Sequence, residues 1–339
     1  MKKYILSVDG GNSKTDYLLT DTMGNFVFLG RYGTCSHEQF KNGYEGMFKA
    51  MKEHLCDLFC KNNIDVSDIL HCTFGLAGCD MPSQHKKLSE KIKLLGFNEF
   101  SLYNDALLGL YAISDEGVGV CSVCGTGTVT LGINEKKEIL QVGGIGTLTQ
   151  DFAGGAFLSR EVIGRCYEYY FRCGKETILT SYLEKILNIK DFNNFYEILS
   201  DSDLLKEKQL EIIQSLDKAV LENDFVAVDI MKNMAKNLGY GTLGCIKKLG
   251  FTTKLEVVLI GSIWKRLKNN ILFNDYKEIL FYNGYDDINF VILDTPPVIG
   301  GIFNSIKILK LHSNIDYKKE LKDFLTIDKY DEIIKNLKE

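Results

Sequence analysis

The chain has 339 residues, of which 45% are hydrophobic and 25% are charged, a composition typical of a globular protein large enough for two domains. Its formal net charge of −5 and pI near 5.7 argue against a nucleic-acid-binding surface, and no basic run with interleaved aromatic residues occurs. The first residues show neither a signal-peptide pattern nor a membrane span, so we expect a cytoplasmic protein without membrane partners.

Residues 4–20 predict two strands around a Gly-Gly turn, and the first strand ends at Asp9. Glycines allow close backbone approach to a ligand, and consecutive turn N–H groups can bind a phosphate. Further donors are available from Ser13, Lys14 and Thr15, and Asp9 could hold a metal through water. An ordinary hairpin turn is the alternative interpretation.

The next predicted elements alternate between strands and helices, which indicates a parallel extension of the sheet. In chain order they are a strand at 26–30, a helix at 43–62, a strand at 69–78, a helix at 83–95, a strand at 99–103 and a helix at 107–113. Asp105 follows a strand directly, and in open α/β sheets ligands bind at the carboxyl ends of strands. A helix N-cap formed by Asn104 or Asp105 is the alternative.

Residues 119–142 repeat the opening arrangement of strand, glycine turn and strands, with Gly125-Thr126-Gly127 as the turn. Two such turns can hold one phosphate chain from opposite sides of a cleft, which favours anion binding by both. Cys121 and Cys124 have CxxC spacing, but they lie in a predicted strand, where a zinc or redox pair is not expected. The glycine-rich residues 143–155 around Asp151 predict a loop close to a ligand.

Helical periodicity dominates residues 175–248, where we expect helical packing and no chemistry. Two further strands, at 254–260 and 290–293, lead to glycines that let a flat group approach the backbone: Gly261 beside Ser262, and Gly300 with Gly301. The tail from residue 317 is predicted to be an amphipathic helix with a solvated face.

Five segments, taken together and in order, resemble the phosphate loops, catalytic aspartate and adenosine loops of the actin-like ATPase and sugar kinase superfamily: VDGGNSKTD, YNDA, VCGTGTVTLG, LIGSIWKR and PPVIGG. More narrowly, the chain resembles the N-acetylglucosamine kinase branch of the BadF/BadG/BcrA/BcrD-type ATPase family. No Walker A motif is present, so nucleotide chemistry of the P-loop kind is not expected.

The resemblance implies an α/β protein of two actin-like (ribonuclease H-like) domains, each with a mixed sheet, with ATP and substrate in the cleft between them. Residues 1–113 would form the first domain, and 114–316 the second, with a helical insertion at 175–248. A helix at 317–339 would pack back on the first domain.

The resemblance also implies roles for individual residues. Asp105 would act as general base on the sugar hydroxyl, and Asp9 would position Mg²⁺ through water. The residues implied for the phosphates of ATP are Gly10, Gly11, Asn12, Ser13, Lys14, Thr15, Gly125, Thr126 and Gly127. Those implied for adenosine are Gly261, Ser262, Gly300 and Gly301. Those implied for the sugar are Ser36, His37, Gly78, Asp105, Gly144, Ile145 and Asp151.

The predicted function is therefore ATP- and Mg²⁺-dependent phosphorylation of a hexose or amino sugar, with N-acetylglucosamine as the first choice, by a homodimer. The sugar pocket departs from the family pattern. Related kinases tend to have an Asn where this chain has residues 35–38, an aromatic residue where it has Ile145, and GDEGS where it has residues 150–154.

Two other functions are compatible with the resemblance. One is an ATPase activator of a radical dehydratase or reductase that carries an iron-sulfur cluster across a dimer. Cys124 lies near the second phosphate turn, but no second cysteine follows at a helix entry, which disfavours this function. The other is a non-catalytic sugar-sensing protein, which the presence of Asp105 disfavours.

Overall fold

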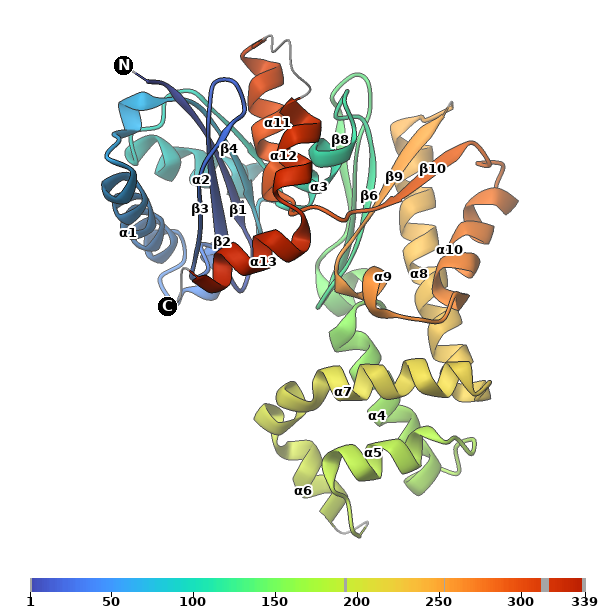
Figure 1. Cartoon of the computed structure of the whole chain (residues 1–339). Coiled ribbons are helices and arrows are strands. Elements are labelled where there is room, and N and C mark those ends of the chain that lie inside the picture. Colours follow the sequence, from blue (N-terminus) through green and yellow to red (C-terminus); the bar gives the residue numbers. More distant parts are fainter. Residues whose placement is uncertain (1, 192–193, 253, 312–316, 337–339) are drawn as a thin grey trace. The chain divides into compact units, whose positions relative to one another are not determined.

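The computed structural model describes residues 2–191, 194–252, 254–311 and 317–336 (Figure 1). The chain divides into two compact units, of which unit 1 comprises Met1–Cys121 and Leu293–Glu339, and unit 2 comprises Ser122–Ile292. The boundaries expected from the sequence differ from this division: residues 114–121 and 293–316 are expected in the second domain, whereas they belong to unit 1. The difference arises because the helix that follows residue 297 packs on the first sheet, a contact that periodicity along the chain does not reveal.

Each unit is built on one five-stranded sheet, and the strand orders are β3-β2-β1-β4-β5 and β10-β9-β6-β7-β8. The strands of the first sheet are β1 (Tyr4–Gly10), β2 (Thr15–Asp21), β3 (Phe26–Tyr32), β4 (Ile69–Leu76) and β5 (Phe100–Tyr103). Those of the second are β6 (Gly119–Cys124), β7 (Thr128–Ile133), β8 (Ile139–Gly143), β9 (Leu255–Ile260) and β10 (Ile288–Ile292).

Both sheets are mixed. In the first, β1 pairs antiparallel with β2 and parallel with β4; in the second, β7 and β8 are antiparallel and β9 and β10 are parallel. The expected α/β architecture, with a mixed sheet in each half, is therefore confirmed. The repeated meander brings a glycine turn to the end of the first strand of each sheet.

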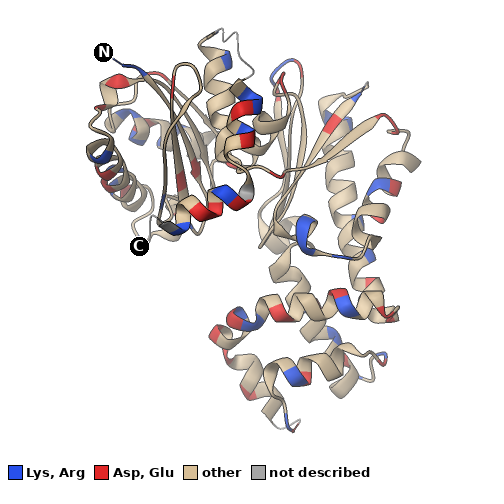
Figure 2. Cartoon of the chain, viewed as in Figure 1, with Lys and Arg blue, Asp and Glu red and all other residues tan. Residues whose placement is uncertain are grey.

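Helices cover both faces of the first sheet. On one face lie α1 (Tyr44–Asn62) and α2 (Pro82–Leu94). On the other lie α11 (Val298–Ile308) and the C-terminal helices α12 (Tyr317–Phe324) and α13 (Ile327–Asn336), while α3 (Ala106–Ile113) packs against α11. The C-terminal helices carry charges of both signs toward solvent (Figure 2), but their apolar side chains are buried on the sheet.

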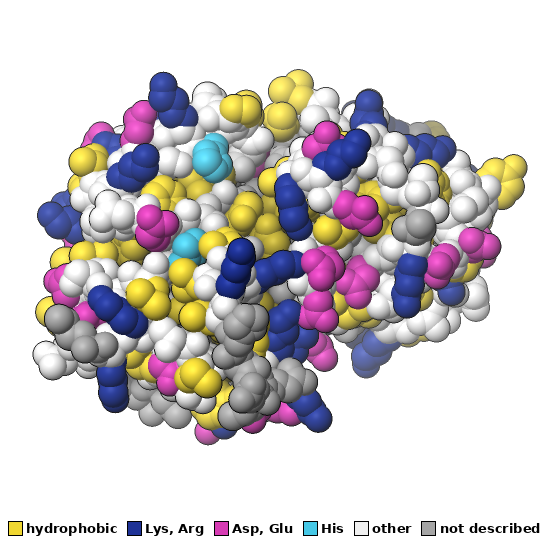
Figure 3. All heavy atoms as spheres, turned by 90° about the horizontal axis from the view of Figure 1, so that it is seen from above, with side chains coloured by type: hydrophobic (Ala, Val, Ile, Leu, Met, Phe, Trp, Pro, Cys, Tyr) yellow, Lys and Arg dark blue, Asp and Glu magenta, His cyan; other side chains and the backbone are white. Residues whose placement is uncertain are grey.

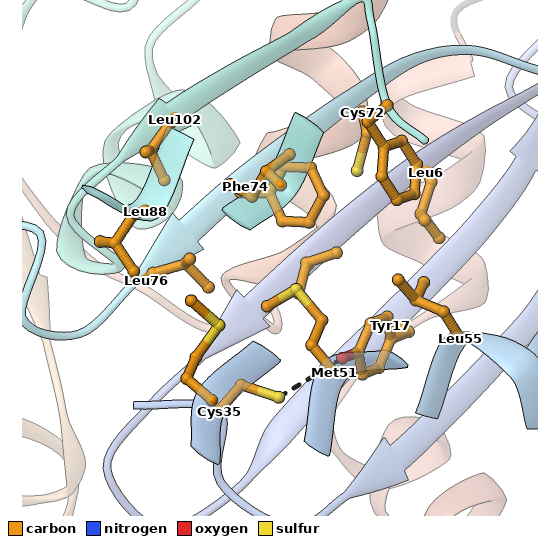
Figure 4. Close-up of a cluster of buried hydrophobic side chains, with 14 of the residues drawn as sticks. Leu6, Tyr17, Cys35, Met51, Leu55, Cys72, Phe74, Leu76, Leu88 and Leu102 are labelled. Carbon is orange, nitrogen blue, oxygen red and sulfur yellow. Dashed lines mark hydrogen bonds between the residues drawn. The ribbon is translucent and has the colours of Figure 1, made fainter. Parts of the chain in front are cut away.

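The alternation of side chains along each strand decides which helices they contact. Leu6 and Val8 of β1 join the core under α1 and α2, whereas Ile5 joins the core under α11. Figure 4 shows the first of these cores, in which Tyr17 and Met51 meet side chains from four other elements. Because both faces of β1 are buried, its register is fixed, and so is the position of the turn that follows it.

The helices of unit 2 form a layer behind its sheet and a separate helical group. They are α4 (Gly155–Phe171), α5 (Leu179–Leu187), α6 (Phe195–Ser200), α7 (Ser202–Leu221), α8 (Phe225–Leu249), α9 (Ser262–Arg266) and α10 (Ile271–Tyr282). Helix α8 covers β7 and β8 and packs against α10, while α4, α5, α6 and α7 contact one another (Figure 1). Short 3₁₀ helices occupy His37–Gln39, Val66–Asp68 and Gly146–Thr149.

The surface carries charges of both signs. On the face seen in Figure 3, lysine and arginine side chains are intermixed with aspartate and glutamate side chains. None of the helices in the described ranges combines the length and the apolar character needed to cross a membrane.

Two glycines allow α11 to lie very close to the rest of unit 1. A Cβ atom at Gly300 would lie 1.9 Å from the backbone oxygen of Leu108 on α3, and one at Gly301 would lie 2.0 Å from Ser7 Oγ on β1. The close approach predicted at this pair therefore exists, but the approaching atoms belong to the protein itself. These contacts lend no support to the adenosine role expected for Gly300 and Gly301.

This packing predicts that Gly300→Ala destabilises the protein by about 1–3 kcal/mol, because the added methyl group forces helix and backbone apart. Gly244→Ala is the matched control, since Gly244 lies inside α8 and a Cβ there meets no atom within 4 Å. That change should be neutral or stabilise by about 0.5–1 kcal/mol. Urea unfolding of both variants checks the prediction, and equal midpoints would contradict it.

A buried histidine lies at the centre of a polar network between β4, β5 and α11. His71 Nδ1 is 2.9 Å from Ser305 Oγ, its Nε2 is 3.3 Å from Ser101 Oγ, and Ser305 Oγ is 2.8 Å from Thr73 Oγ1. Burial lowers the pKa of His71, because the charged imidazolium would lose its hydration. The network therefore holds a neutral histidine.

We expect the stability of the protein to fall as the pH drops below about 6.5, the usual histidine pKa. The lowered pKa of His71 means that the unfolded chain takes up a proton before the folded chain does. His71→Gln should reduce the pH dependence of unfolding between pH 7 and 5 by up to about 1.4 kcal/mol per pH unit. His85→Gln, at an exposed position on α2, is the control and should leave the slope as it is in the wild type.

Candidate active site

The turn between β1 and β2 presents polar groups to solvent. Gly11 N donates to Lys14 O at 2.9 Å, and the residues Asn12, Ser13 and Lys14 are exposed. Thr15 is expected to donate to a phosphate, but it begins β2 and its side chain is fully buried. The accessible donors of this turn are thus its backbone and three of the predicted side chains.

Gly10 and Gly11 differ in how much space surrounds them, and neither has a positive φ. A Cβ at Gly10 would lie 2.6 Å from Leu76 Cδ2, so packing excludes a side chain there. A Cβ at Gly11 would meet only Lys14 O at 3.5 Å and Asp105 Oδ2 at 4.0 Å, which are ordinary contacts. The space in front of Gly11 is therefore open and borders the Asp105 carboxylate.

A buried ion pair supports the turn. Arg31 Nε and Nη2 donate to the two carboxylate oxygens of Asp16 at 2.6 and 3.0 Å, and Lys14 Nζ lies 3.1 Å from Asp16 Oδ2. Arg31 Nη2 also donates to the hydroxyl of Tyr330 on α13 at 3.0 Å. Burial alone would raise the pKa of Asp16, but the hydrogen bond from Arg31 and the charge of Lys14 hold it below its usual value. The sequence motifs do not indicate Asp16, Arg31 or Tyr330 as part of the site.

Asp9, at the end of β1, has no such support. Burial and then the carboxylates of Asp16 and Asp105 raise the pKa of Asp9 well above its ordinary value. Within the described part of the chain no hydrogen bond or ion pair reaches its side chain. A divalent cation near Asp9 would relieve this repulsion, so the residue suits the predicted magnesium site.

Asp105 lies directly after β5 and is the N-cap of α3, where its Oδ1 accepts from Ala106 N at 3.1 Å. The capping role and the site role are thus compatible, because the other oxygen is the one that borders Gly11. Burial raises the pKa of Asp105 to about 6, with a contribution from the negative charge of Asp80. Asn104 Nδ2 donates to Asp80 Oδ1 at 2.6 Å, so Asp80 is bound to the residue that precedes Asp105.

The loop after β3 brings the predicted sugar residues of unit 1 next to this turn. Thr34 Oγ1 donates to Gly11 O at 2.8 Å and accepts from Ser36 N at 3.0 Å. Ser36 and His37 are buried, and neither Ser36 Oγ nor His37 Nδ1 has a partner. Gly78 has φ +76°, and a Cβ there would lie 2.7 Å from His37 Cε1. Unit 1 therefore brings together Asp105, the first turn and three sugar candidates, with Thr34 as an additional link.

The second glycine turn, in unit 2, is as open as the first. Gly125 N donates to Gly127 O at 3.0 Å, and neither glycine has a positive φ. A Cβ at Gly125 or Gly127 would meet no atom within 4 Å. Neither a positive φ nor packing requires glycine at these positions, so the turn is open enough for the phosphate contact that stays a prediction.

Two other glycines hold the surrounding backbone against this turn. Gly154 has φ +88°, and a Cβ there would lie 2.7 Å from Gly127 O. Gly261 has φ +114°, and a Cβ there would lie 2.3 Å from Cys124 O. The sequence predicted close approach to a ligand at both, whereas the structure shows close approach to the chain's own backbone.

A pocket of about 710 Å³ in unit 2 adjoins the second turn. Gly125, Thr126 and Ser262 line it, as does one face of α7 that carries Leu210, Ile213, Gln214, Asp217, Lys218 and Leu221. Arg266 and Lys268 add positive charge to its wall. The region expected to contribute helical packing thus also lines a pocket through α7, and its lack of chemistry stays a prediction. The spacing of these residues at i, i+3, i+4 and i+7 was the available signal.

The predicted sugar residues of unit 2 lie in a different loop. Asp151 accepts from Gly144 N at 2.9 Å and Gly146 N at 2.6 Å through Oδ2, and from Thr149 Oγ1 at 2.9 Å through Oδ1. The Asp151 carboxylate thus accepts three hydrogen bonds from its own loop. Ile145, in the same loop, is 59% exposed. Contact of Asp151 with a sugar stays a prediction.

The buried cysteines of β6 do not resemble an accessible metal or redox pair. Cys121 and Cys124 are buried thiols, and burial raises the pKa of Cys124 to about 12. In the ranges that the structure describes, no group of three Cys, His, Asp or Glu side chains could hold a metal ion directly. A magnesium ion held by Asp9 through water does not require such a group.

Comparisons of the sequence with known proteins point to sugar kinases. No protein-family model matches the chain. It is 21% identical to an N-acetylmuramic acid/N-acetylglucosamine kinase of Clostridium acetobutylicum over 302 residues, which cover 88% of this chain and 97% of that protein. It is 25% identical to an N-acetyl-D-glucosamine kinase of Dictyostelium discoideum over 200 residues, 56% of this chain and 61% of that protein.

The structure agrees with these similarities. A solved protein of Chromobacterium violaceum with the provisional name N-acetylglucosamine kinase superposes with a TM-score of 0.64 at 17% identity, covering 90% of this chain and 99% of that chain. The chain has the sugar kinase fold. The broader resemblance to actin-like ATPases and sugar kinases is therefore confirmed at the level of fold, while membership of the BadF/BadG/BcrA/BcrD family stays a prediction.

The open space at the second turn gives a direct test of ligand approach. Gly127→Ala should leave the thermal midpoint of this sugar kinase fold nearly unchanged, since the methyl group meets no protein atom. It should weaken binding of a non-hydrolysable ATP analogue about tenfold, equivalent to about 1.4 kcal/mol. Gly164→Ala on α4, also in open space, is the matched control and should bind normally. Titration calorimetry measures both, and equal affinities would remove the turn from the nucleotide site.

Proposed function

We propose that this chain transfers the γ-phosphoryl group of ATP to a hydroxyl group of an amino sugar, with N-acetylglucosamine as the leading candidate. The relatives named for N-acetylglucosamine and N-acetylmuramic acid support this substrate class. The single observation that carries the mechanism is the position of Asp105, whose free oxygen borders the open space at Gly11.

Phosphoryl transfer requires a positioned nucleophile and neutralisation of the phosphate charges, and little covalent chemistry from the protein. Asp105 meets the first requirement as general base, since a carboxylate with a pKa of about 6 is ionised at neutral pH but basic enough to take a hydroxyl proton in the transition state. The N–H groups of the first turn, with Asn12, Ser13 and Lys14, would meet the phosphates, as would the turn at Gly125, Thr126 and Gly127.

Asp9 would hold Mg²⁺ through water, and the ion would neutralise charge on the phosphates. The nucleotide would occupy the pocket beside the second turn, where Ser262 lies at the start of α9 and the face of α7 forms one wall. On the sugar side, Ser36 Oγ and His37 Nδ1 offer buried polar atoms without partners, which a hydroxyl or N-acetyl group would satisfy.

The alternative function, an activating ATPase with an iron-sulfur cluster, is not favoured. The proteins to which the chain is similar are named as sugar kinases, and Cys124 is a buried thiol with a raised pKa rather than an accessible ligand. A non-catalytic sensor would not need a carboxylate with the properties of Asp105. A homodimer also remains part of this proposal.

Asp105→Asn should lower kcat for sugar-dependent ADP release by about 10²–10⁴-fold, while binding of ATP changes little. In the wild type, the rate should rise with pH and level off above about pH 6, because Asp105 must be deprotonated to accept the proton. A coupled ADP assay over a panel of amino sugars and hexoses measures both.

Asp115→Asn, at a surface position bound to Lys318, is the matched control and should keep full activity. Turnover of Asp105→Asn close to that of the wild type would contradict the proposed base. Failure of every sugar to stimulate ADP release would contradict the proposed function as a whole.

A further inference from the structure

The sugar side of unit 1 carries two carboxylates in addition to Asp105. Glu38 follows His37 in the loop after β3, and Asp80 lies in the loop after β4. A Cβ at Gly78 would lie 3.2 Å from Glu38 Cδ. Asn104, the residue before Asp105, donates a hydrogen bond to the Asp80 carboxylate. Both carboxylates lie close enough to Asp105 to add to the negative field that it experiences.

Neither of these two carboxylates is paired with a cation. In the part of the chain that the structure describes, neither Glu38 nor Asp80 forms an ion pair, and the partner recorded for the Asp80 carboxylate is the neutral amide of Asn104. Lys87 lies nearby, 5.2 Å from the centroid of the Tyr44 ring that stacks on His37. The wall beside the general base therefore carries Glu38, Asp80 and Asp105, and Lys87 offsets part of their negative charge.

A second, independent observation favours a polar ligand at this wall. His37 is only 9% exposed, and among the residues that the structure describes its Nδ1 has no hydrogen-bond partner. That atom lies 3.1 Å from the Cβ position of Gly78, on the same side as the Glu38 carboxyl. A buried nitrogen without a hydrogen bond is costly, so a bound polar group is the natural partner for it.

We propose that Glu38 and Asp80 set the charge selectivity of this site: it accepts neutral amino sugars and rejects those that carry a carboxylate. The inference rests on the proposed function and narrows its substrate class. N-acetylglucosamine is neutral, whereas N-acetylmuramic acid carries a carboxylate. One relative is named for both sugars. Repulsion between like charges is the physical basis of the discrimination, and Asp80, which is partly buried, is less screened by water than the exposed Glu38.

The test compares kcat/KM for N-acetylglucosamine, N-acetylmuramic acid and the methyl ester of N-acetylmuramic acid. The ester keeps the bulk of the acid but not its charge. We expect the wild type to use the ester at least about tenfold better than the acid, and Glu38→Gln to reduce that ratio about tenfold. Asp80→Asn should act in the same direction. Glu90→Gln, an exposed position on α2, removes the same charge elsewhere and should leave the ratio at the wild-type value.

The outcomes distinguish the charge selectivity from the choice of substrate class and from the proposed function. Equal use of acid and ester by the wild type, or a ratio that Glu38→Gln does not change, would overturn the charge selectivity and leave the kinase function intact. Rejection of acid and ester alike would show that size rather than charge excludes the lactyl group, and would also overturn it. Absence of turnover with all three sugars, with ADP release stimulated by another sugar, would overturn the choice of substrate class. Absence of turnover with any sugar would overturn the proposed function itself.

Discussion

Repulsion among carboxylates around one glycine turn is the constraint on which unit 1 depends. Asp9, Asp16 and Asp105 lie close enough for their charges to interact, and Asp80 adds to the field at Asp105. Asp16 alone is neutralised, by Arg31 and Lys14, and it is also the most deeply buried. The other two are left with raised pKa values. One crowded set of acids thus has one paired member and two unpaired members, which suits the proposed roles of Asp9 beside a cation and of Asp105 as a base.

The framework that holds these acids in place is apolar and tightly packed. The strand β1 is buried on both faces, so Asp9 cannot move without disturbing the cores under α1 and α11. Gly300 brings α11 almost into backbone contact with α3, Gly301 brings it against the Ser7 side chain of β1, and Asp105 is the N-cap of α3. The acid at the start of α3 and the acid at the end of β1 are therefore fixed by the same helix contacts.

Much of this arrangement could be predicted from the sequence, and the parts that could not have a common cause. The strands, the two glycine turns and the position of Asp105 follow from alternation, turn residues and chain order, which are local signals. Tyr330 could not be found in this way, because it meets Arg31 only through folding of segments 299 residues apart. Arg31 faces Asp16 across the strands β2 and β3, but pairing of the two depends on the register of these strands. Nor does the sequence distinguish a glycine that faces open space, such as Gly127, from one that touches its own backbone, such as Gly261. The part of α7 in the pocket wall is also hard to predict, because a stripe of mixed residues on a helix resembles ordinary packing.

The discontinuous make-up of unit 1 has a consequence for how the protein is made. Its sheet is formed by residues 4–103, but one face of that sheet is covered by α11, α12 and α13, which follow unit 2 in the chain. Unit 2 is continuous and is translated before these helices. During synthesis the apolar side chains of Ile5, Leu18 and Leu29 therefore stay uncovered until unit 2 has been translated. The order of translation thus makes the docking of these helices a late step in the folding of unit 1, and it leaves an apolar face of the sheet open to aggregation until then.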